Sequence, residues 1–244
     1  MDNVVVTGAS RGIGLAIARK LAASGYGVTA VARASGDELE AAIEACKREA
    51  VGSLGFAALD LSQIEAIPEF VRQLRRQTGP IYGLVNNAGI GTEGLLATMP
   101  NSQIEALLRL NNLSPIVLTK YVVRGMMAEG RGRIVNLSSI IASTGYNALS
   151  VYGATKAAMV GFTKSLSREV GRLGITVNAI APGFIDTEMT RGLDEAQRNR
   201  IADRSALRRL AGVEDVANMA AFLMGETGRN ITGAVMTIDA GATA

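Results

Sequence analysis

Histidine and tryptophan are missing from this chain of 244 residues, and there is a single cysteine. The lack of histidine excludes Ser-His-Asp and Cys-His catalytic units, His-ligated zinc and any histidine general base. The lone cysteine excludes disulfides within the chain, thiolate clusters and dithiol redox motifs. We expect Cys46 to fill the core on one helical face with Leu39, Ile43 and Ala50. An aromatic content of 4% argues against a base-stacking surface, so we predict neither a metal site nor a nucleic-acid partner.

Long apolar runs and strings of like charge are also missing. No apolar stretch reaches the roughly 18 residues that a membrane-spanning helix needs. The net charge is only +3 and forms no polybasic run. The first predicted strand begins near Asn3, which leaves no room for a signal peptide. We therefore expect a soluble cytoplasmic protein without a membrane partner.

Short apolar segments alternate with amphipathic ones along the whole chain, and this pattern predicts the fold. Apolar residues make up 48% of the chain, which excludes a disordered protein. The predicted strands are Val4–Val6, Val28–Ala32, Gly55–Leu59, Ile81–Val85, Arg133–Leu137, Thr176–Ile180 and Val235–Ile238. The predicted helices are Gly12–Ser24, Asp37–Ala50, Gln63–Gln77, Ser102–Ala128, Val151–Leu173 and Val213–Met224.

Continuously apolar strands separated by helices pair in parallel through right-handed crossovers. We therefore predict one α/β domain over residues 1–244, a Rossmann-like, doubly wound parallel sheet of seven strands with helices on both faces. Segment 186–210 is polar and arginine-rich and lies outside the alternation. It is either a solvated loop or a lid over a site at the carboxyl ends of the strands, where open α/β sheets bind ligands.

A glycine-rich turn joins the first predicted strand to the first helix. Its residues are Thr7, Gly8, Ala9, Ser10, Arg11, Gly12, Ile13 and Gly14. The glycines allow a tight turn and close approach to a phosphate, and the helix N-terminus supplies N–H donors and a positive dipole. In this strand–turn–helix context the pattern predicts a nucleotide site, with a purely structural turn as the alternative.

The end of the second predicted strand indicates which dinucleotide binds. An acidic residue there would hold the ribose 2′-hydroxyl of NAD. This chain has Ala32 and Arg33 instead, and Arg11 lies in the glycine turn. Two guanidiniums without a carboxylate suit a 2′-phosphate, so we predict NADP(H).

Three residues form a candidate catalytic group. Tyr152 and Lys156 lie four residues apart at the start of a predicted helix, hence on one face, and Ser139 follows the preceding strand. Reduction of a ketone needs a proton donor at the developing alkoxide, which Tyr152 could be. A nearby ammonium would favour the phenolate of a side chain that normally titrates near ~10. The serine hydroxyl could hold the carbonyl oxygen.

With further motifs, these residues resemble the short-chain dehydrogenase/reductase family in an ordered series over nearly the whole chain. The further motifs are Asp60, Asn86-Asn87-Ala88-Gly89, Asn112 and Pro182-Gly183-Phe184-Ile185-Asp186-Thr187. The resemblance implies a catalytic set of Asn112, Ser139, Tyr152 and Lys156. In it Ser139 binds the carbonyl, Tyr152 is the acid/base, Lys156 also binds the nicotinamide ribose, and Asn112 anchors a proton-relaying water.

The resemblance also implies cofactor contacts beyond the glycine turn. Asp60 would contact the adenine, although it could instead be a strand-end cap. Asn87 and Gly89 would line the adenosine, although Asn86–Gly89 could be a structural turn. The nicotinamide end would be held by Pro182, Gly183, Ile185 and Thr187.

The position of Asn112 has a second interpretation, a helix defect. Pro115 frees the carbonyl of Asn111 and should kink the helix there. Defect and function would then coincide, because the kink would help expose a backbone carbonyl to water.

Within the family the chain is most similar to the 3-oxoacyl-[acyl-carrier-protein] reductases, over Gly132–Ser139, Lys164–Val170 and Gly174–Ile185. That similarity implies NADPH-dependent reduction of a 3-oxoacyl thioester, with acyl carrier protein as candidate carrier, in a homotetramer. Basic residues that would meet the carrier are displaced by one position, to Arg131 and Arg172. The alternatives are a reductase or alcohol dehydrogenase for acetoacetyl-CoA or another small carbonyl compound, and a non-catalytic NADP-binding regulator or assembly protein.

Overall fold

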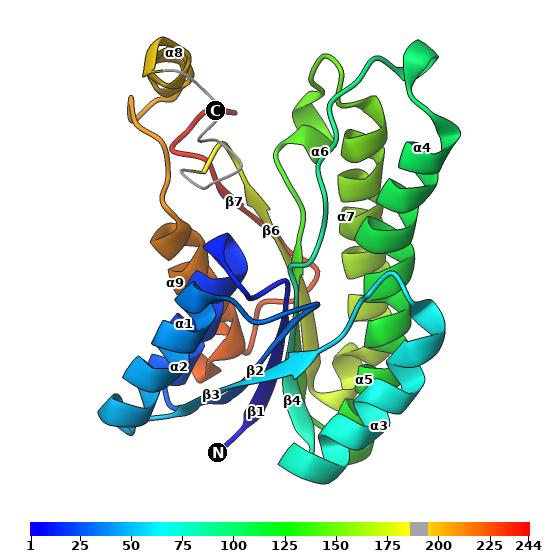
Figure 1. The fold of residues 1–244 in the computed structure, drawn as a ribbon, viewed down its shortest axis with the longest axis vertical. Coiled ribbons are helices and arrows are strands. Elements are labelled where there is room, and N and C mark those ends of the chain that lie inside the picture. Colours follow the sequence, from blue (N-terminus) through cyan, green and yellow to red (C-terminus); the bar gives the residue numbers. More distant parts are fainter. Residues whose placement is uncertain (186–194) are drawn as a thin grey trace.

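The computed structural model describes residues 1–185 and 195–244, and in it one parallel sheet is covered by helices on both faces (Figure 1). The strands are β1 (Asn3–Thr7), β2 (Gly27–Ala32), β3 (Ser53–Ala58), β4 (Ile81–Asn86), β5 (Gly132–Leu137), β6 (Ile175–Pro182) and β7 (Val235–Ile238). They lie in the order β3-β2-β1-β4-β5-β6-β7, and all neighbours are parallel. The predicted doubly wound, seven-stranded fold is confirmed.

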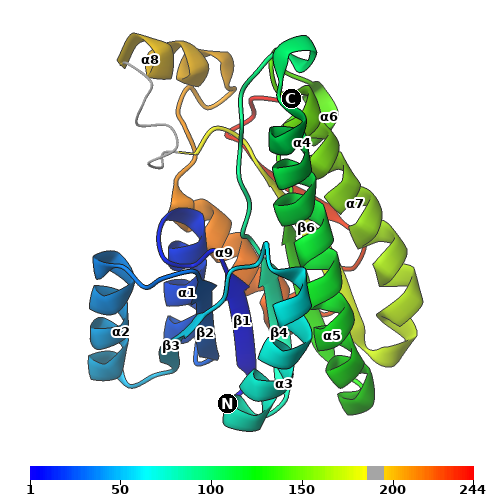
Figure 2. The same cartoon turned by 45° about the vertical axis from the view of Figure 1, so that its right-hand side comes forward.

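The helices divide between the two faces of the sheet. Their bounds are α1 (Gly12–Ala23), α2 (Asp37–Glu49), α3 (Ile67–Thr78), α4 (Asn101–Leu108), α5 (Ser114–Glu129), α6 (Ile141–Thr144), α7 (Ser150–Val170), α8 (Glu195–Arg204) and α9 (Val213–Met224). Helices α1, α2 and α9 cover one face, and α3, α5 and α7 cover the other (Figures 1 and 2). Along the described chain, no helix combines the length and apolar composition that crossing a membrane requires.

Alternate residues of the strands serve two separate cores. In β1, Val4 and Val6 pack with α1 and α9, whereas Val5 packs with α3 and α5. The same alternation in β5 sends Val135 to the first core and Ile134 to the second. Strands with apolar residues on both faces are expected for a parallel sheet covered by helices.

The single helix predicted over 102–128 is interrupted. A π-helical turn, Arg109–Leu113, separates α4 from α5, and the N–H of Ser114 donates to the carbonyl of Arg109, five residues back. Pro115 has no N–H to continue the normal helical pattern. Single π-helical turns of this kind are frequent at functional sites.

The interpretation of the lone cysteine is only partly correct. Leu39 is fully buried in the core and Cys46 packs against it, as expected. Ala50 is exposed, because the helix ends at Glu49 and Ala50 adopts a left-handed conformation with φ of 54°. It therefore leaves the apolar face on which it was placed.

A close backbone approach at Gly52 holds the connection between α2 and β3 against the turn between α1 and β2. A Cβ at this position would lie 2.3 Å from the carbonyl oxygen of Ala22 and 2.5 Å from that of Tyr26. Gly171, which follows α7, has open space around the same position and helical backbone angles.

We expect Gly52→Ala to lower the free energy of unfolding by about 1–3 kcal/mol, because two backbone carbonyls must move. Gly171→Ala is the matched control and should be neutral or stabilising by up to about 1 kcal/mol. Urea unfolding of both variants measures the difference. Equal stabilities of the two variants would contradict the close approach described for Gly52.

Candidate active site

The candidate site lies at the carboxyl ends of the central strands, where the glycine turn, the segment after β4, the end of β5 and the start of α7 come together. Buried polar side chains fix the two helices behind it. Asn86 in β4 donates to Asn136 in β5 (2.8 Å) and to Thr119 in α5 (3.0 Å), and Asn136 donates to Thr163 in α7 (2.9 Å). These bonds fix the positions of α5 and α7 along the two central strands.

The glycine turn has the geometry that its sequence predicts. Gly8 and Gly12 have φ of +65° and +57°, in the left-handed region that favours glycine. A Cβ at Gly14 would lie 2.3 Å from the carbonyl oxygen of Gly8, so no side chain fits there. The space where a Gly12 side chain would stand is open. The turn and the N-terminus of α1 thus form a cradle in which a phosphate group fits.

Asn87 supports this turn from the neighbouring strand. Its Nδ2 donates to the carbonyls of Thr7 (2.8 Å) and Gly8 (3.1 Å). The backbone N–H groups of Asn87 and Ala88 both donate to the hydroxyl of Thr7 at 3.0 Å. The interpretation of this segment as a structural brace is therefore correct, and contact between Asn87 and an adenosine stays a prediction.

The end of β2 presents basic groups and an unpaired hydroxyl. Arg33 and Arg11 are both exposed. The Oγ of Ser35 is buried without a hydrogen-bond partner among the described residues. These groups suit a phosphate, which accepts hydrogen bonds from hydroxyl and guanidinium donors.

Asp60 has a structural partner of its own after β3. Its Oδ1 accepts hydrogen bonds from the Ser62 hydroxyl (2.7 Å) and the Ser62 N–H (2.9 Å). These bonds, with a smaller contribution from Arg33, hold the pKa of Asp60 below its usual value. The local turn agrees with the cap interpretation, and the adenine contact stays a prediction.

The π-helical turn presents two neighbouring asparagines to α7. Asn111 donates to Thr155 Oγ1 (3.1 Å) and exchanges two 2.9 Å hydrogen bonds with the backbone of Ile90. Asn112 donates to the carbonyl of Thr155 at 2.8 Å. The Oδ1 of Asn112 is buried and has no partner in the described part of the chain. An unsatisfied buried acceptor of this kind is a place where a water molecule binds.

The structure brings Ser139, Tyr152 and Lys156 together. Lys156 Nζ lies 5.7 Å from the centroid of the Tyr152 ring and donates to the carbonyl of Leu137 at 2.9 Å. The hydroxyl of Ser138 donates to the carbonyl of Lys156 at 2.9 Å and so joins the end of β5 to α7. Ser139 is buried, and its hydroxyl lies close enough to Tyr152 to lower the pKa of that phenol.

Burial dominates the titration of both groups on α7. It lowers the pKa of Lys156 to about 8. It also raises the pKa of Tyr152 from its ordinary value, and the nearby hydroxyl of Ser139 offsets this only in part. The expectation that Lys156 lowers the pKa of Tyr152 is not met in this structure. The ammonium lies over the ring and binds the carbonyl of Leu137.

The segment after β6 lies beside the end of β5 and borders the candidate site. Pro182 ends β6 and its carbonyl accepts the N–H of Ile140 at 3.0 Å. A Cβ at Gly183 would lie 2.6 Å from Cβ of Asp239, which explains the glycine. The side chain of Ile185 is buried in the core.

Two predictions fall on the chain after Ile185. Thr187 and residues 186–194 of the proposed lid lie outside the described residues. Beyond them, α8 forms within the segment predicted to be a loop or a lid outside the alternation of strands and helices. The lid role of this segment stays a prediction.

Three residues that hold the site were missed from the sequence. Asn111, Ser138 and Thr155 bind backbone or side chains across elements, as described above. Their neighbours Asn112, Ser139 and Lys156 carried the recognisable motifs. Each of the three missed residues is polar and directly precedes a motif residue. A polar residue in that position, at a strand end or a helix defect, could have indicated a supporting role. Among the described residues, no cluster of His, Cys, Asp or Glu could hold a metal ion.

The chain is similar in sequence to a protein family and to several named reductases. A family model described as short chain dehydrogenase matches residues 2–198. The 3-oxoacyl-[acyl-carrier-protein] reductase of Pseudomonas aeruginosa is 40% identical over 238 residues, 97% of this chain and 95% of that protein. The reductase of the same name from Staphylococcus epidermidis is 35% identical over 239 residues, 98% of each chain.

Solved structures give the same result. A short-chain dehydrogenase/reductase from Serratia marcescens has a TM-score of 0.92 at 33% identity and covers all of this chain, which covers 98% of it. A blue fluorescent protein from a metagenomic library, solved in complex with NADPH, has a TM-score of 0.91 at 33% identity with the same coverage.

The buried ammonium of Lys156 should cost stability at neutral pH. Lowering a lysine pKa from 10.5 to about 8 corresponds to about 3 kcal/mol. We expect Lys156→Met to raise the free energy of unfolding at pH 7 by about 1–3 kcal/mol without cofactor. Between pH 8 and 10.5 the gain should shrink, because the unfolded parent still holds the proton that the folded parent has lost.

Urea unfolding at pH 7, 9 and 10.5 measures this effect. Lys164 lies on the same helix but is exposed, so Lys164→Met is the control and should show no such pH-dependent gain. A difference between Lys156→Met and the parent that stays constant with pH would contradict the burial argument.

Proposed function

The chain belongs to the short-chain dehydrogenase family of oxidoreductases, and we propose that it is an NADPH-dependent ketoreductase acting on 3-oxoacyl thioesters. The product would be the 3-hydroxyacyl thioester. The observation that carries the proposal is the convergence of Ser139, Tyr152 and Lys156, with Asn112 behind them. The intact set also counts against a non-catalytic regulator or assembly protein.

The residues present fit a nicotinamide dinucleotide. The open cradle above Gly12 suits its pyrophosphate, and Arg11, Arg33 and the unpaired hydroxyl of Ser35 suit a 2′-phosphate. A Cβ at Gly89 would lie 3.7 Å from Lys156 Nζ, so the glycine keeps the space beside the ammonium open. The blue fluorescent protein that resembles this chain was solved in complex with NADPH, which supports NADP(H) as the proposed cofactor. For this chain the preference for NADP(H) over NAD(H) is part of the proposal.

The chain's own residues would hold the ketone and move the proton. The cofactor supplies the hydride when bound. Ser139 would donate to the carbonyl oxygen and Tyr152 would protonate it as the alkoxide develops. Lys156 would bind the nicotinamide ribose, and Asn112 would hold a water molecule near α7 through its unpaired Oδ1. The proton lost by Tyr152 could then be replaced from solvent.

An apolar surface near the site supports an acyl substrate. Leu95 and Leu96, after β4, and Tyr146, before α7, are large apolar side chains that are more than half exposed. A hydrogen bond from Gly94 N–H to the carbonyl of Ala148 (2.9 Å) joins the two segments. The names of the reductases from Pseudomonas and Staphylococcus also support a 3-oxoacyl thioester.

The substrate has two candidates, a thioester carried by acyl carrier protein and a compound that needs no carrier protein. Arg131, one of the displaced basic residues, forms an ion pair with Asp2 and lies over the ring of Tyr82, 4.9 Å from its centroid. Arg131 therefore already has partners within the chain, which an acidic carrier protein would have to replace. This observation favours the second candidate, a reductase or alcohol dehydrogenase for acetoacetyl-CoA or another small carbonyl compound.

A homotetramer in the cytoplasm, without nucleic-acid or membrane partners, completes the proposal. Large apolar side chains are exposed on α4 and α5 and on the turn between them. They are Leu108, Leu113, Ile116 and Met127. On α7, the exposed Ala157 and Ala158 are small enough to permit close helix packing between subunits, whereas the side-chain position of Gly153 faces Ile141 of the same chain. These surfaces are suited to burial against further copies of the chain.

Tyr152→Phe should lower turnover of an acetoacetyl thioester by about two to four orders of magnitude, because the ring remains but the proton donor is lost. NADPH affinity should change little. Tyr121→Phe removes a hydroxyl on α5, outside both the catalytic set and the apolar surface, and is the matched control. Steady-state rates and NADPH binding of folded variants measure both effects.

The same assay on the parent separates the candidate substrates. Faster turnover of acyl-carrier-protein thioesters than of coenzyme A thioesters and matched free ketones supports the first candidate. Near-parental activity of Tyr152→Phe would overturn the mechanism with every substrate.

Ala32→Asp should shift the preference from NADPH toward NADH. The new carboxylate would repel a 2′-phosphate beside Arg33 and accept a hydrogen bond from a free 2′-hydroxyl. Ala41→Asp adds the same charge on the exposed side of α2 and should leave the preference unchanged. The ratio of kcat/KM for the two cofactors tests this, and an unaltered ratio in Ala32→Asp would refute the reading of the β2 end.

A further inference from the structure

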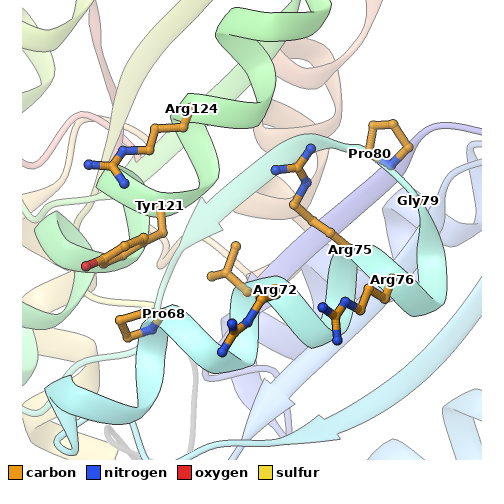
Figure 3. Close-up of a pocket in the computed structure, with 9 residues that line it drawn as sticks. Pro68, Arg72, Arg75, Arg76, Gly79, Pro80, Tyr121 and Arg124 are labelled. Carbon is orange, nitrogen blue, oxygen red and sulfur yellow. The ribbon is translucent and has the colours of Figure 1, made fainter.

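A second candidate binding site lies between α3 and α5. A cavity of about 500 Å³ opens there, lined by arginines from both helices (Figure 3). Arg72, Arg75 and Arg76 come from α3, and Arg124 comes from α5 beside Tyr121. Gly79 and Pro80, at the rim, directly precede β4. The cavity therefore lies toward the amino end of the sheet, away from the candidate active site at the carboxyl ends.

The spacing of the three arginines on α3 explains why they line the same cavity. Positions 72, 75 and 76 are three and four residues apart, which places them on one face of α3. Val71 and Leu74 are buried under that helix and fix its orientation on the sheet. Figure 3 shows Arg124 and Tyr121 on α5 across from the arginines of α3. Two helices thus contribute four arginines to the lining of one cavity.

Two of the arginines are held in place by their neighbours. A Cβ at Gly125 would lie 3.2 Å from Cζ of Arg75, so the missing side chain lets that guanidinium lie against α5. The guanidinium of Arg124 lies 5.3 Å from the centroid of the Tyr121 ring. Such contacts reduce the conformational freedom that an arginine loses when it binds a ligand.

The positive charge of the cavity is poorly compensated. Arg72 forms an ion pair with Glu69 of the same helix. Arg75, Arg76 and Arg124 form no ion pair with any residue in ranges 1–185 and 195–244. Like charges gathered in this way repel one another, and the repulsion is relieved by a bound anion.

We propose that this cavity binds a small anion carrying two or more adjacent phosphate groups, either free or on an organic body. Guanidinium groups bind phosphate oxygens in bidentate pairs. Three uncompensated charges on opposing walls match a multiply charged anion better than a single phosphate. The volume lies in the range of about 300–1,000 Å³ that is usual for small-ligand sites. A protein partner would instead need about 800 Å² of complementary surface on each side.

Titration calorimetry with sodium tripolyphosphate in a chloride buffer tests the proposal. The parent should bind with a stoichiometry that includes this cavity. Arg76→Gln/Arg124→Gln should weaken that binding about ten-fold or more, because charge-assisted hydrogen bonds are lost. Arg48→Gln/Arg168→Gln removes the same charge at exposed positions on α2 and α7 and should bind as the parent does.

The glycine turn also fits phosphate, so Arg33→Gln separates the two sites. If the proposal is right, Arg33→Gln keeps the binding that Arg76→Gln/Arg124→Gln loses. Adenosine triphosphate is titrated in parallel to distinguish a free polyphosphate from one attached to an organic body. If the organic body contributes to binding, adenosine triphosphate should bind more tightly than tripolyphosphate.

Three outcomes would overturn the proposal. They are no binding by the parent at millimolar tripolyphosphate, equal binding by both double variants, and binding of a poly-glutamate peptide without binding of tripolyphosphate. Circular dichroism of each variant shows whether it is folded, and Arg76→Lys/Arg124→Lys provides a second pair. It keeps the charge but loses the bidentate geometry, so it should bind between the parent and the glutamine pair.

Discussion

The position of the candidate site depends on a buried network of amides and hydroxyls between the sheet and its helices. Asn86 and Asn136 face each other in register on β4 and β5. Through Thr119 and Thr163 they also bind α5 and α7. These side chains are withdrawn from water, so a shift of either helix by one turn would leave donors unpaired at a cost of about 1–3 kcal/mol each. The network therefore specifies where Tyr152 and Lys156 stand relative to the strand ends.

The fold was largely predictable because its sequence signals agree at every level. Each predicted strand overlaps an observed one, since an apolar segment buried on both faces allows few alternatives. The differences arise where local geometry overrides the average pattern. The long helix is broken because Pro115 cannot donate a hydrogen bond, and Ala50 turns away because α2 ends one residue earlier. Such boundaries are decided by individual hydrogen bonds, which hydrophobic periodicity does not encode.

The candidate site was predictable in its residue types and less so in its contacts. Spacing placed Tyr152 and Lys156 on one face, and the strand end placed Ser139 near them. The supporting partners could not be derived, because they are long-range pairs. Asn111 reaches Ile90 and Thr155, which lie 21 and 44 residues away in the sequence. Asn87 similarly has its main partners in the glycine turn. The family resemblance implies an adenosine contact for Asn87 and leaves a structural turn as the alternative.

Burial sets the protonation state of the site and so bears on the direction of the proposed reaction. It raises the pKa of Tyr152, so the phenol, which is protonated at neutral pH even without the shift, stays protonated to a higher pH. Lys156, with a pKa of about 8, still carries its proton in most molecules at pH 7. A protonated phenol is the form that donates a proton to a developing alkoxide, whereas the oxidation of an alcohol needs the phenolate. The same desolvation that costs stability thus extends the pH range over which Tyr152 can donate a proton. Oxidation would be favoured only as rising pH, or new positive charge beside the ring, stabilises the phenolate.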